Sequence, residues 1–285
     1  MSDARPVHTR RVEMPCQMYD ALIPERLPPP LNLSDNDHAV LAETEEALRT
    51  RTLDDAARDA LARTEAAAAC RLDGLGVTAE TLTSFLETGD VPGDASDDDL
   101  HEAAGSLDAL SLIADHIGAN GDPVTLRLLR DVHQRVLSSE RGRGKQPGAF
   151  RRQQTWVGGE SPVDADFVPP RPGDIMDVMG PLERFINGVP ETLPPLQTAA
   201  LAYAQLYMTQ PFLTANGRMA HLLVPMILVA RGVLDDPVLP VSVEIEAHRD
   251  AHDDALRQIR TRGDWEGWIR FLVERIADAG ARAGK

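Results

Sequence analysis

Apolar side chains recur every three or four residues through most of this 285-residue sequence, and that period constrains the fold more than any other feature. It is regular in residues 107–117 and 126–136 and returns in several later segments. The later segments predict helices at residues 175–186, 197–209, 217–231, 245–262 and 265–279. Spaced leucines from Leu41 to Leu61 and the alanines at 66–69 predict two more helices near the N-terminus. The sequence therefore predicts a mostly α-helical protein.

Three segments depart from this helical pattern. Residues 142–172 are rich in Gly, Pro and Gln, and the Gly158–Gly159 pair between β-forming residues predicts a short hairpin. The proline-marked start predicts an extended arm, and the small acidic residues 94–99 predict a linker. These boundaries divide the chain into an arm (1–33), an N-terminal helical subdomain (34–95) and a main domain (100–285).

Charge and composition limit the partners. The net charge of −16 argues against nucleic acid and against an anionic membrane surface, because both attract clustered Lys and Arg. The longest apolar run, residues 222–230, contains Pro225 and is too short to span a bilayer, and the N-terminus has no apolar signal segment. Cys16 and Cys70 lack metal-type spacing. We expect a cytoplasmic protein with reduced thiols and no nucleic-acid or membrane partner.

A small polar loop precedes the apolar helix predicted at residues 217–231. It contains Asn216, Gly217 and Arg218 in succession. Unpaired N–H groups at a helix start point towards a ligand, and a glycine lets the backbone approach that ligand closely. The arginine guanidinium can donate two parallel hydrogen bonds to an anion. The sequence therefore predicts an anion-binding loop.

The stretch from Gln210 to His221 resembles the Fic (Fido-fold) signature, His-Pro-Phe-x-acidic-Gly-Asn-Gly-Arg-x-x-Arg, of enzymes that transfer AMP from ATP to protein hydroxyl groups. The resemblance covers roughly residues 15–280 and includes a region similar to the family's flap. It implies a helical bundle with a short β-hairpin flap and an N-terminal helical subdomain. It also implies that the flap binds a target peptide by main-chain pairing, and it is compatible with a homodimer. The flap residues would be Thr155, Trp156, Val157 and Gly158.

Half of the chemically active positions of the signature carry other residues in this chain. Where the family has its histidine, acidic residue, first glycine and second arginine, this chain has Gln210, Thr214, Ala215 and His221. A primary amide has no useful basicity near neutral pH, and loss of a positioned base costs about 10²–10⁴ in rate. Threonine offers Mg²⁺ one neutral oxygen, so the sequence argues against a dependence on Mg²⁺. A histidine also binds a triphosphate less tightly than an arginine does. Standard AMP transfer is not expected, and the cofactor is unknown, with a nucleotide as one candidate.

Other side chains could enter the same site. Tyr207 precedes Gln210 by one turn, so its phenol either lines the pocket or packs in the core. His248 and His252 are four residues apart, a spacing also used for metal ligands, although solvated or capping roles are more common. By the resemblance, their helix lines the nucleotide-base pocket, so His221 would share one cavity with them. No metal is expected.

A possible regulatory segment lies earlier in the chain. Many family members carry an inhibitory helix whose glutamate pairs with the second arginine of the signature. The matching place here ends in Asp73 and Gly74, and the residue at the arginine position is His221. Either the inhibitory contact has been lost at both of its residues, or the site binds a different ligand.

Three functional hypotheses follow. The first is a divergent Fic enzyme that uses the loop for a non-standard reaction on a phosphorylated, nucleotidylated or carboxylated small molecule, with Gln210, Arg218, His221 and Tyr207 as candidate catalytic residues. The second is a non-catalytic module that binds a nucleotide or a peptide. The third is residual AMP transfer. The residues expected to bind a ligand or phosphate are Thr214, Ala215, Asn216, Gly217, Arg218, His248 and His252.

Overall fold

The computed structural model describes residues 9–14, 17–93, 95–118, 122–189 and 192–282. The helices in this part of the chain are α1 (Asp35–Arg49), α2 (Asp55–Leu72), α3 (Ala79–Thr88), α4 (Asp97–Ile113), α5 (Leu126–Val136), α6 (Glu140–Arg143), α7 (Ile175–Ile186), α8 (Pro195–Thr209), α9 (Asn216–Ala230), α10 (Val241–Ala247), α11 (Arg249–Arg262) and α12 (Trp265–Arg282). A π-helical turn, Ala114–Gly118, extends α4, and a 3₁₀ turn, Pro172–Asp174, precedes α7. The strands are β1 (Thr9–Met14) and β2 (Gln17–Leu22). The mostly α-helical prediction is confirmed.

Polar caps define several helix starts. Ser34 and Asp37 form a capping box at α1, and Asp54, Thr78 and Thr125 each accept a backbone N–H at the start of α2, α3 and α5. One predicted helix is divided. Residues 245–262 do not form one continuous helix, because His248 leaves helical geometry and separates α10 from α11.

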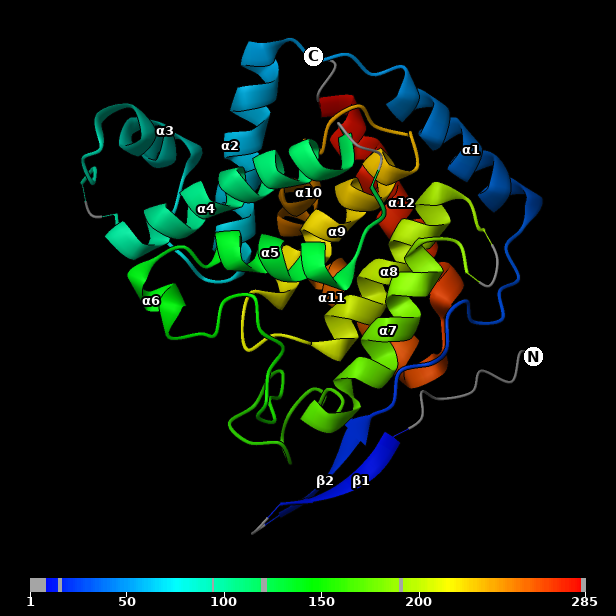
Figure 1. Cartoon of the computed structure of the whole chain (residues 1–285). Coiled ribbons are helices and arrows are strands. Elements are labelled where there is room, and N and C mark those ends of the chain that lie inside the picture. The colour runs from blue at the N-terminus through cyan, green and yellow to red at the C-terminus, as the bar shows by residue number, and fades with distance from the viewer. Residues whose placement is uncertain (1–8, 15–16, 94, 119–121, 190–191, 283–285) are drawn as a thin grey trace.

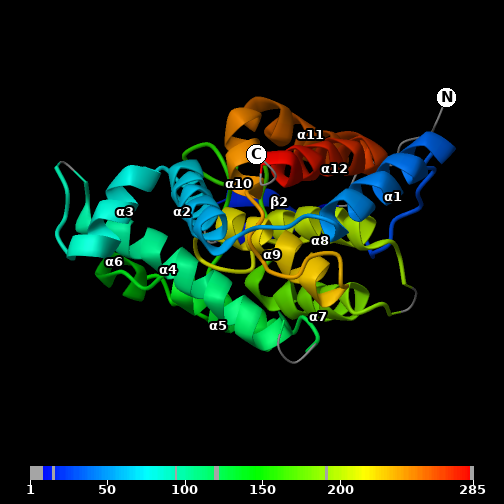
Figure 2. The ribbon, with the colours of Figure 1, turned by 90° about the horizontal axis from the view of Figure 1, so that it is seen from above.

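The core is built around α8 and α9. Both helices are apolar on nearly every face, and α8 packs between α7, α9 and α12 in the middle of the bundle (Figures 1 and 2). Trp268 of α12 is fully buried, and its indole N–H donates to the carbonyl oxygen of Ala200 at 2.7 Å. Met208, Met219 and Met226 are also buried, so they fill the core.

A smaller apolar cluster joins α2, α3 and α4 at one end of the molecule (Figure 2). The predicted acidic linker is shorter than expected, because Asp97, Asp98 and Asp99 form the first turn of α4. Acidic side chains are favourable there, since the N-terminus of a helix carries a partial positive charge. Cys70 is a buried, free thiol in this cluster, whereas Cys16 lies outside the described residues.

The N-terminal arm is paired rather than simply extended. β1 and β2 form an antiparallel hairpin that pairs Thr9 with Leu22 at its open end. β2 then meets the predicted flap, where the Leu22 N–H donates to the carbonyl oxygen of Val168 at 2.8 Å. The flap itself is held by one antiparallel bridge, between Val157 and Phe167. The long-range partner of β2 explains why a purely local pattern did not predict these strands.

Among the helices of the described ranges, none is both long and apolar enough to span a bilayer.

Candidate functional site

The loop between α8 and α9 is closed by its own side chains. Asn216 accepts the Phe212 N–H at 2.9 Å through Oδ1 and donates to the Phe212 carbonyl oxygen at 3.0 Å through Nδ2. Gln210 and Ala215 bracket the loop with left-handed backbone angles, φ 45° and 59°. The Gln210 amide donates to the carbonyl oxygen of Tyr207 at 2.7 Å. The Asn216 and Gln210 side chains therefore shape the loop.

Two buried residues outside the loop hold it in place. Arg151 donates to the carbonyl oxygens of Gln210 (2.7 Å) and Pro170 (2.5 Å), which ties the loop to the flap. His133 of α5 stacks on the Phe212 ring with 3.8 Å between centroids. The sequence pattern did not reveal either role, because an arginine beside glycines and a histidine on an apolar helix face are both common without such contacts.

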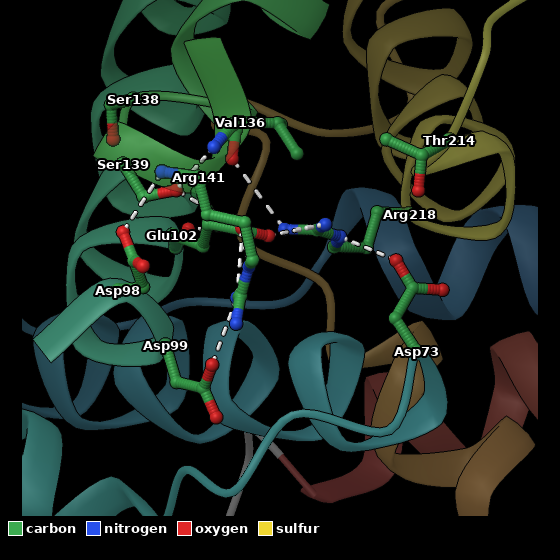
Figure 3. A network of polar contacts seen from close by, with 12 residues as sticks. Asp73, Asp98, Asp99, Glu102, Val136, Ser138, Ser139, Arg141, Thr214 and Arg218 are labelled. Atoms are coloured by element: carbon green, nitrogen blue, oxygen red, sulfur yellow. Dashed lines mark hydrogen bonds and ion pairs between the residues drawn. The ribbon is translucent and has the colours of Figure 1, made fainter. Parts of the chain in front are cut away.

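Arg218 is enclosed by carboxylates (Figure 3). Its Nε donates to Asp73 Oδ2 at 2.6 Å and its Nη2 to Glu102 Oε2 at 2.7 Å, and its side chain is 3% exposed. Glu102 also accepts from Arg141, which in turn pairs with Asp99. The guanidinium that was expected to bind an external anion is therefore already hydrogen-bonded to two carboxylates of the chain itself. The partner of Asp73 is Arg218, and not the residue at position 221.

The Asp73 carboxylate lies at the start of α9. Asp73 is the residue that ends α2, where its backbone N–H donates to the carbonyl oxygen of Cys70, and it is followed by Gly74 with a left-handed φ of 83°. A Cβ on Gly217 would lie 3.5 Å from Asp73 Oδ1. Burial raises the Asp73 pKa, and the positive charge of Arg218 opposes that rise. A carboxylate of the chain itself thus lies beside the N-terminus of α9, close to the place where a helix start attracts an anion.

A cavity of about 60 Å³ adjoins this carboxylate. It is lined by Leu72, Asp73, Tyr207, Gly217, His221, Ile245, Arg249, His252 and Asp253. Of the three histidines expected to share one cavity, His221 and His252 line it, and Tyr207 lines it as well. Sites for drug-sized ligands measure about 300–1,000 Å³, so this cavity holds only a small group unless Asp73 moves.

Two of the side chains that line the cavity, Tyr207 and His221, are uncharged near pH 7. Burial raises the pKa of Tyr207 to about 12, which keeps its phenol protonated. Burial, His252 and Arg218 lower the pKa of His221 to about 3, so its imidazole is uncharged. Nε2 of His252 lies 2.8 Å from the Tyr203 hydroxyl, and its Nδ1 lies 2.8 Å from Asp253 Oδ1.

His248 does not join the other histidines. Its Nδ1 lies 2.9 Å from the Glu244 carbonyl oxygen, and its Nε2 accepts from Arg275 Nη1 at 2.6 Å. The break between α10 and α11 at His248 removes the shared helix face that its spacing from His252 had predicted. Within the described ranges, no three His, Cys, Asp or Glu residues are grouped to hold a metal ion.

The loop does not fit the Mg²⁺ ion that the family resemblance implies. Residues 210–217 contain no carboxylate. Thr214 lies with its carbonyl oxygen 3.3 Å from His133 Nε2, and the adjoining carboxylate of Asp73 pairs with Arg218. Mg²⁺ is usually held by one or two carboxylates together with substrate phosphates, which this loop does not provide.

The comparisons with known proteins agree with this architecture. Residues 123–228 match the model of the Fic/DOC family. The protein adenylyltransferase Fic of Culex quinquefasciatus is 30% identical over 204 residues, which are 71% of this chain and 38% of the relative. The chain thus spans little more than a third of that relative's length.

Solved structures share the fold. A Fic family protein from Desulfovibrio desulfuricans matches with a TM-score of 0.72 at 19% identity, over 90% of this chain and 76% of that one. IbpAFic2, covalently tethered to Cdc42, matches with a TM-score of 0.51 at 16% identity, over 87% and 72%. The family-model match and the sequence relative identify residues 123–228 as a Fic/DOC-family region of this chain, and the solved structures show that the chain has the Fic fold.

Proposed function

We propose that this protein is a divergent Fic-fold transferase-like protein that acts on a small phosphorylated, nucleotidylated or carboxylated molecule at the cavity beside α9. The observation that carries the proposal is the grouping of Gly217, Tyr207, His221 and Arg249 around one cavity. A helix N-terminus, an arginine and a protonated phenol form a donor set suited to negative charge.

The chemistry follows from these donors. Burial raises the pKa values of Asp73 and Tyr207, and the charge of Arg249 opposes that rise, so its charge reaches the cavity. It and the first N–H groups of α9 would stabilise negative charge that develops on a substrate. Tyr207, protonated at neutral pH, would donate a hydrogen bond to the same group.

Asp73 would regulate access to this site. Its carboxylate pairs with Arg218 at 2.6 Å and lies beside Gly217 in the first turn of α9. If the end of α2 moved away, Arg218 and the N–H groups of α9 would become available to a ligand. Asp73 and Gly74 are therefore proposed as an autoinhibitory segment that an anionic substrate displaces.

Standard AMP transfer is not proposed as the main activity. At the place of the family's histidine, Gln210 carries an amide that cannot accept a proton from an attacking hydroxyl. Thr214 offers Mg²⁺ no carboxylate. Residual AMP transfer stays a testable alternative, because the curated relatives are named adenylyltransferases.

A second candidate is binding of an extended target peptide at the flap. The exposed Trp156 and the bridge between Val157 and Phe167 support it. A cleft of about 500 Å³ lies beside the flap. There the guanidinium carbon of Arg260, on α11, lies 4.4 Å from the centroid of the Phe167 ring. The Fic domain tethered to Cdc42 gives this candidate a precedent within the fold.

Calorimetric titration with inorganic phosphate, AMP and ATP, combined with ³¹P NMR of the mixtures, tests the main proposal. We expect at least one probe to bind, and Arg249→Met to weaken it about 10-fold or more, since a hydrogen bond to a charged group is worth about 1.5–3 kcal/mol. Arg262→Met, at the exposed far end of α11, is the matched control and should leave binding unchanged.

The same titrations separate the alternatives. Labelled ATP with Mg²⁺ that marks any protein would favour residual AMP transfer. Absence of binding for all three probes, in both the wild type and Asp73→Asn, would rule out the cavity as an anion site.

A further inference from the structure

The cleft beside the flap contains a hydroxyl and a guanidinium that have no polar partner in the described part of the chain. The cleft lies between β2, the flap and α11, and its lining includes Tyr19, Phe167 and Arg260. Figure 1 shows the hairpin and the flap at the same end of the helical bundle. The cleft volume of about 500 Å³ is in the range of ligand sites, about 300–1,000 Å³. Neither Tyr19 nor Arg260 has a role in the main proposal.

Tyr19 of β2 brings a phenol to the cleft. The residue is 6% exposed, and its hydroxyl has no hydrogen-bond partner among the described residues. Its oxygen is not one of the fully enclosed side-chain atoms without a partner, so the exposed part of Tyr19 includes the hydroxyl. Burial raises the pKa of Tyr19, so the hydroxyl keeps its proton near pH 7 and can donate. A buried tyrosine hydroxyl usually finds a partner, so this donor is available to a group from outside the chain.

Arg260 of α11 brings a positive charge to the same cleft. The residue is half-buried, and its guanidinium carbon lies 4.4 Å from the centroid of the Phe167 ring. Within the described ranges, its N–H groups have neither a hydrogen-bond acceptor nor an ion-pair partner. Burial lowers the pKa of Arg260, and Asp166 and Asp253 oppose that fall from beyond ion-pair distance. A guanidinium in this state favours an external anion, whose oxygens accept two parallel hydrogen bonds from it.

The other charged side chains of the cleft do not pair with Arg260. Arg257 pairs with Asp254 on its own helix. Asp20 and Asp166 also line the cleft, and both are exposed. These two carboxylates repel a free anion, so an acceptor for Arg260 is better delivered by a longer segment whose other contacts offset the repulsion.

We propose that Tyr19 and Arg260 bind one acidic side chain of an extended peptide segment that lies in this cleft. The inference rests on the second candidate function, peptide binding at the flap, and adds the chemical class of the peptide. Val163, Phe167 and Val168 give the cleft an apolar wall, and Val163 is 63% exposed. This wall would contact the residues on either side of the acidic one, which a free carboxylate ion could not use.

Fluorescence anisotropy with two labelled octapeptides tests the proposal. The probes are fluorescein-labelled (Glu-Thr)₄ and (Gln-Thr)₄, which share length and alternation and differ in the charge of every second side chain. The net charge of −16 on the protein disfavours non-specific binding of the acidic probe. We expect (Glu-Thr)₄ to bind at least about 10-fold more tightly than (Gln-Thr)₄, because hydrogen bonds to a charged group are the stronger ones.

Two variants connect this preference to the cleft. Arg260→Met keeps the apolar stem and should weaken binding of (Glu-Thr)₄ about 10-fold, whereas Tyr19→Phe removes only the hydroxyl and should weaken it about 3-fold or more. Arg262→Met is the matched control, because Arg262 is exposed on the same helix and does not line the cleft. It should leave binding unchanged. Circular dichroism of each variant checks its fold.

The outcomes separate the inference from the function on which it rests. Equal affinity of the wild type for the two peptides would overturn the inference and leave peptide binding at the flap standing. Absence of binding by both peptides would overturn the inference and the second candidate function together. Binding of (Glu-Thr)₄ that neither Arg260→Met nor Tyr19→Phe weakens would place the acidic segment elsewhere and overturn the assignment of these two residues.

Discussion

Replacing Arg218 tests whether its guanidinium is a structural centre of the fold. Arg218→Met keeps the volume of the side chain but leaves Glu102, with 5% of its side chain exposed, and Asp73, with 25%, without their shared partner. Removing one partner of a buried ion pair costs about 3–5 kcal/mol. Two hydrogen bonds to charged groups, at about 1.5–3 kcal/mol each, give a similar total. We therefore expect Arg218→Met to lower the free energy of unfolding by about 3–5 kcal/mol.

Urea denaturation followed by circular dichroism measures this change. For a domain of this size, each kcal/mol shifts the Tm by about 2–4 °C, so thermal melting should show a fall of about 6–20 °C. Arg127→Met is the matched control, because the Arg127 side chain is 92% exposed and lies 3.9 Å from Asp131. It should stay within about 0.5 kcal/mol of the wild type.

A double-mutant cycle identifies the source of the loss. Combining Arg218→Met with Glu102→Gln should cost less than the sum of the single changes, by about 0.5–3 kcal/mol, because the charge left unpaired is removed as well. The reasoning is refuted if Arg218→Met is as stable as Arg127→Met, since the guanidinium would then make no net contribution to folding.

Three further outcomes are expected. Burial raises the Glu65 pKa to about 7, so folding takes up a proton between about pH 4.5 and 7, and the free energy of unfolding falls as the pH rises through that window. Urea denaturation at several pH values should show that Glu65→Gln reduces this fall by up to about 1.4 kcal/mol per pH unit. The same pH dependence in the wild type and Glu65→Gln would contradict it. Burial also lowers the pKa of His221 to about 3 and of His133 to about 4, so neither ring should titrate between about pH 5 and 8 in NMR. Arg151→Ala should accelerate hydrogen exchange in residues 154–168 and 210–216, since it frees the loop from the flap, whereas exchange in α12 should not change.

The fold was largely predictable because its signal is local. The apolar period of residues 197–209 and 217–231 describes helices that are buried on almost every side, and it needs no knowledge of their partners. The break at His248 was missed because the residues on both sides continue a helical pattern. β2 was missed because its pairing with Val168 joins segments far apart in the sequence.

The candidate site was predictable only in part. Tyr207 and His221 lie near one loop in the sequence, so their shared cavity could be anticipated. The pairing of Arg218 with Glu102 spans 116 residues and leaves no local pattern. Glu65 lies in an alanine-rich helix and looks like a solvated residue, although it is buried against Ser242. Contacts between distant helices thus determine which charges are free to bind a ligand.

The proposal that Asp73 competes with an external anion at the start of α9 can be tested directly by calorimetric titration of inorganic pyrophosphate into the wild type, Asp73→Asn and Asp73→Asn/Arg249→Met. Asp73→Asn removes the negative charge and keeps the shape of the side chain. The account predicts that Asp73→Asn binds pyrophosphate at least about 10-fold more tightly than the wild type, and that the added Arg249→Met reverses the gain. Equal affinity of the wild type and Asp73→Asn would contradict it.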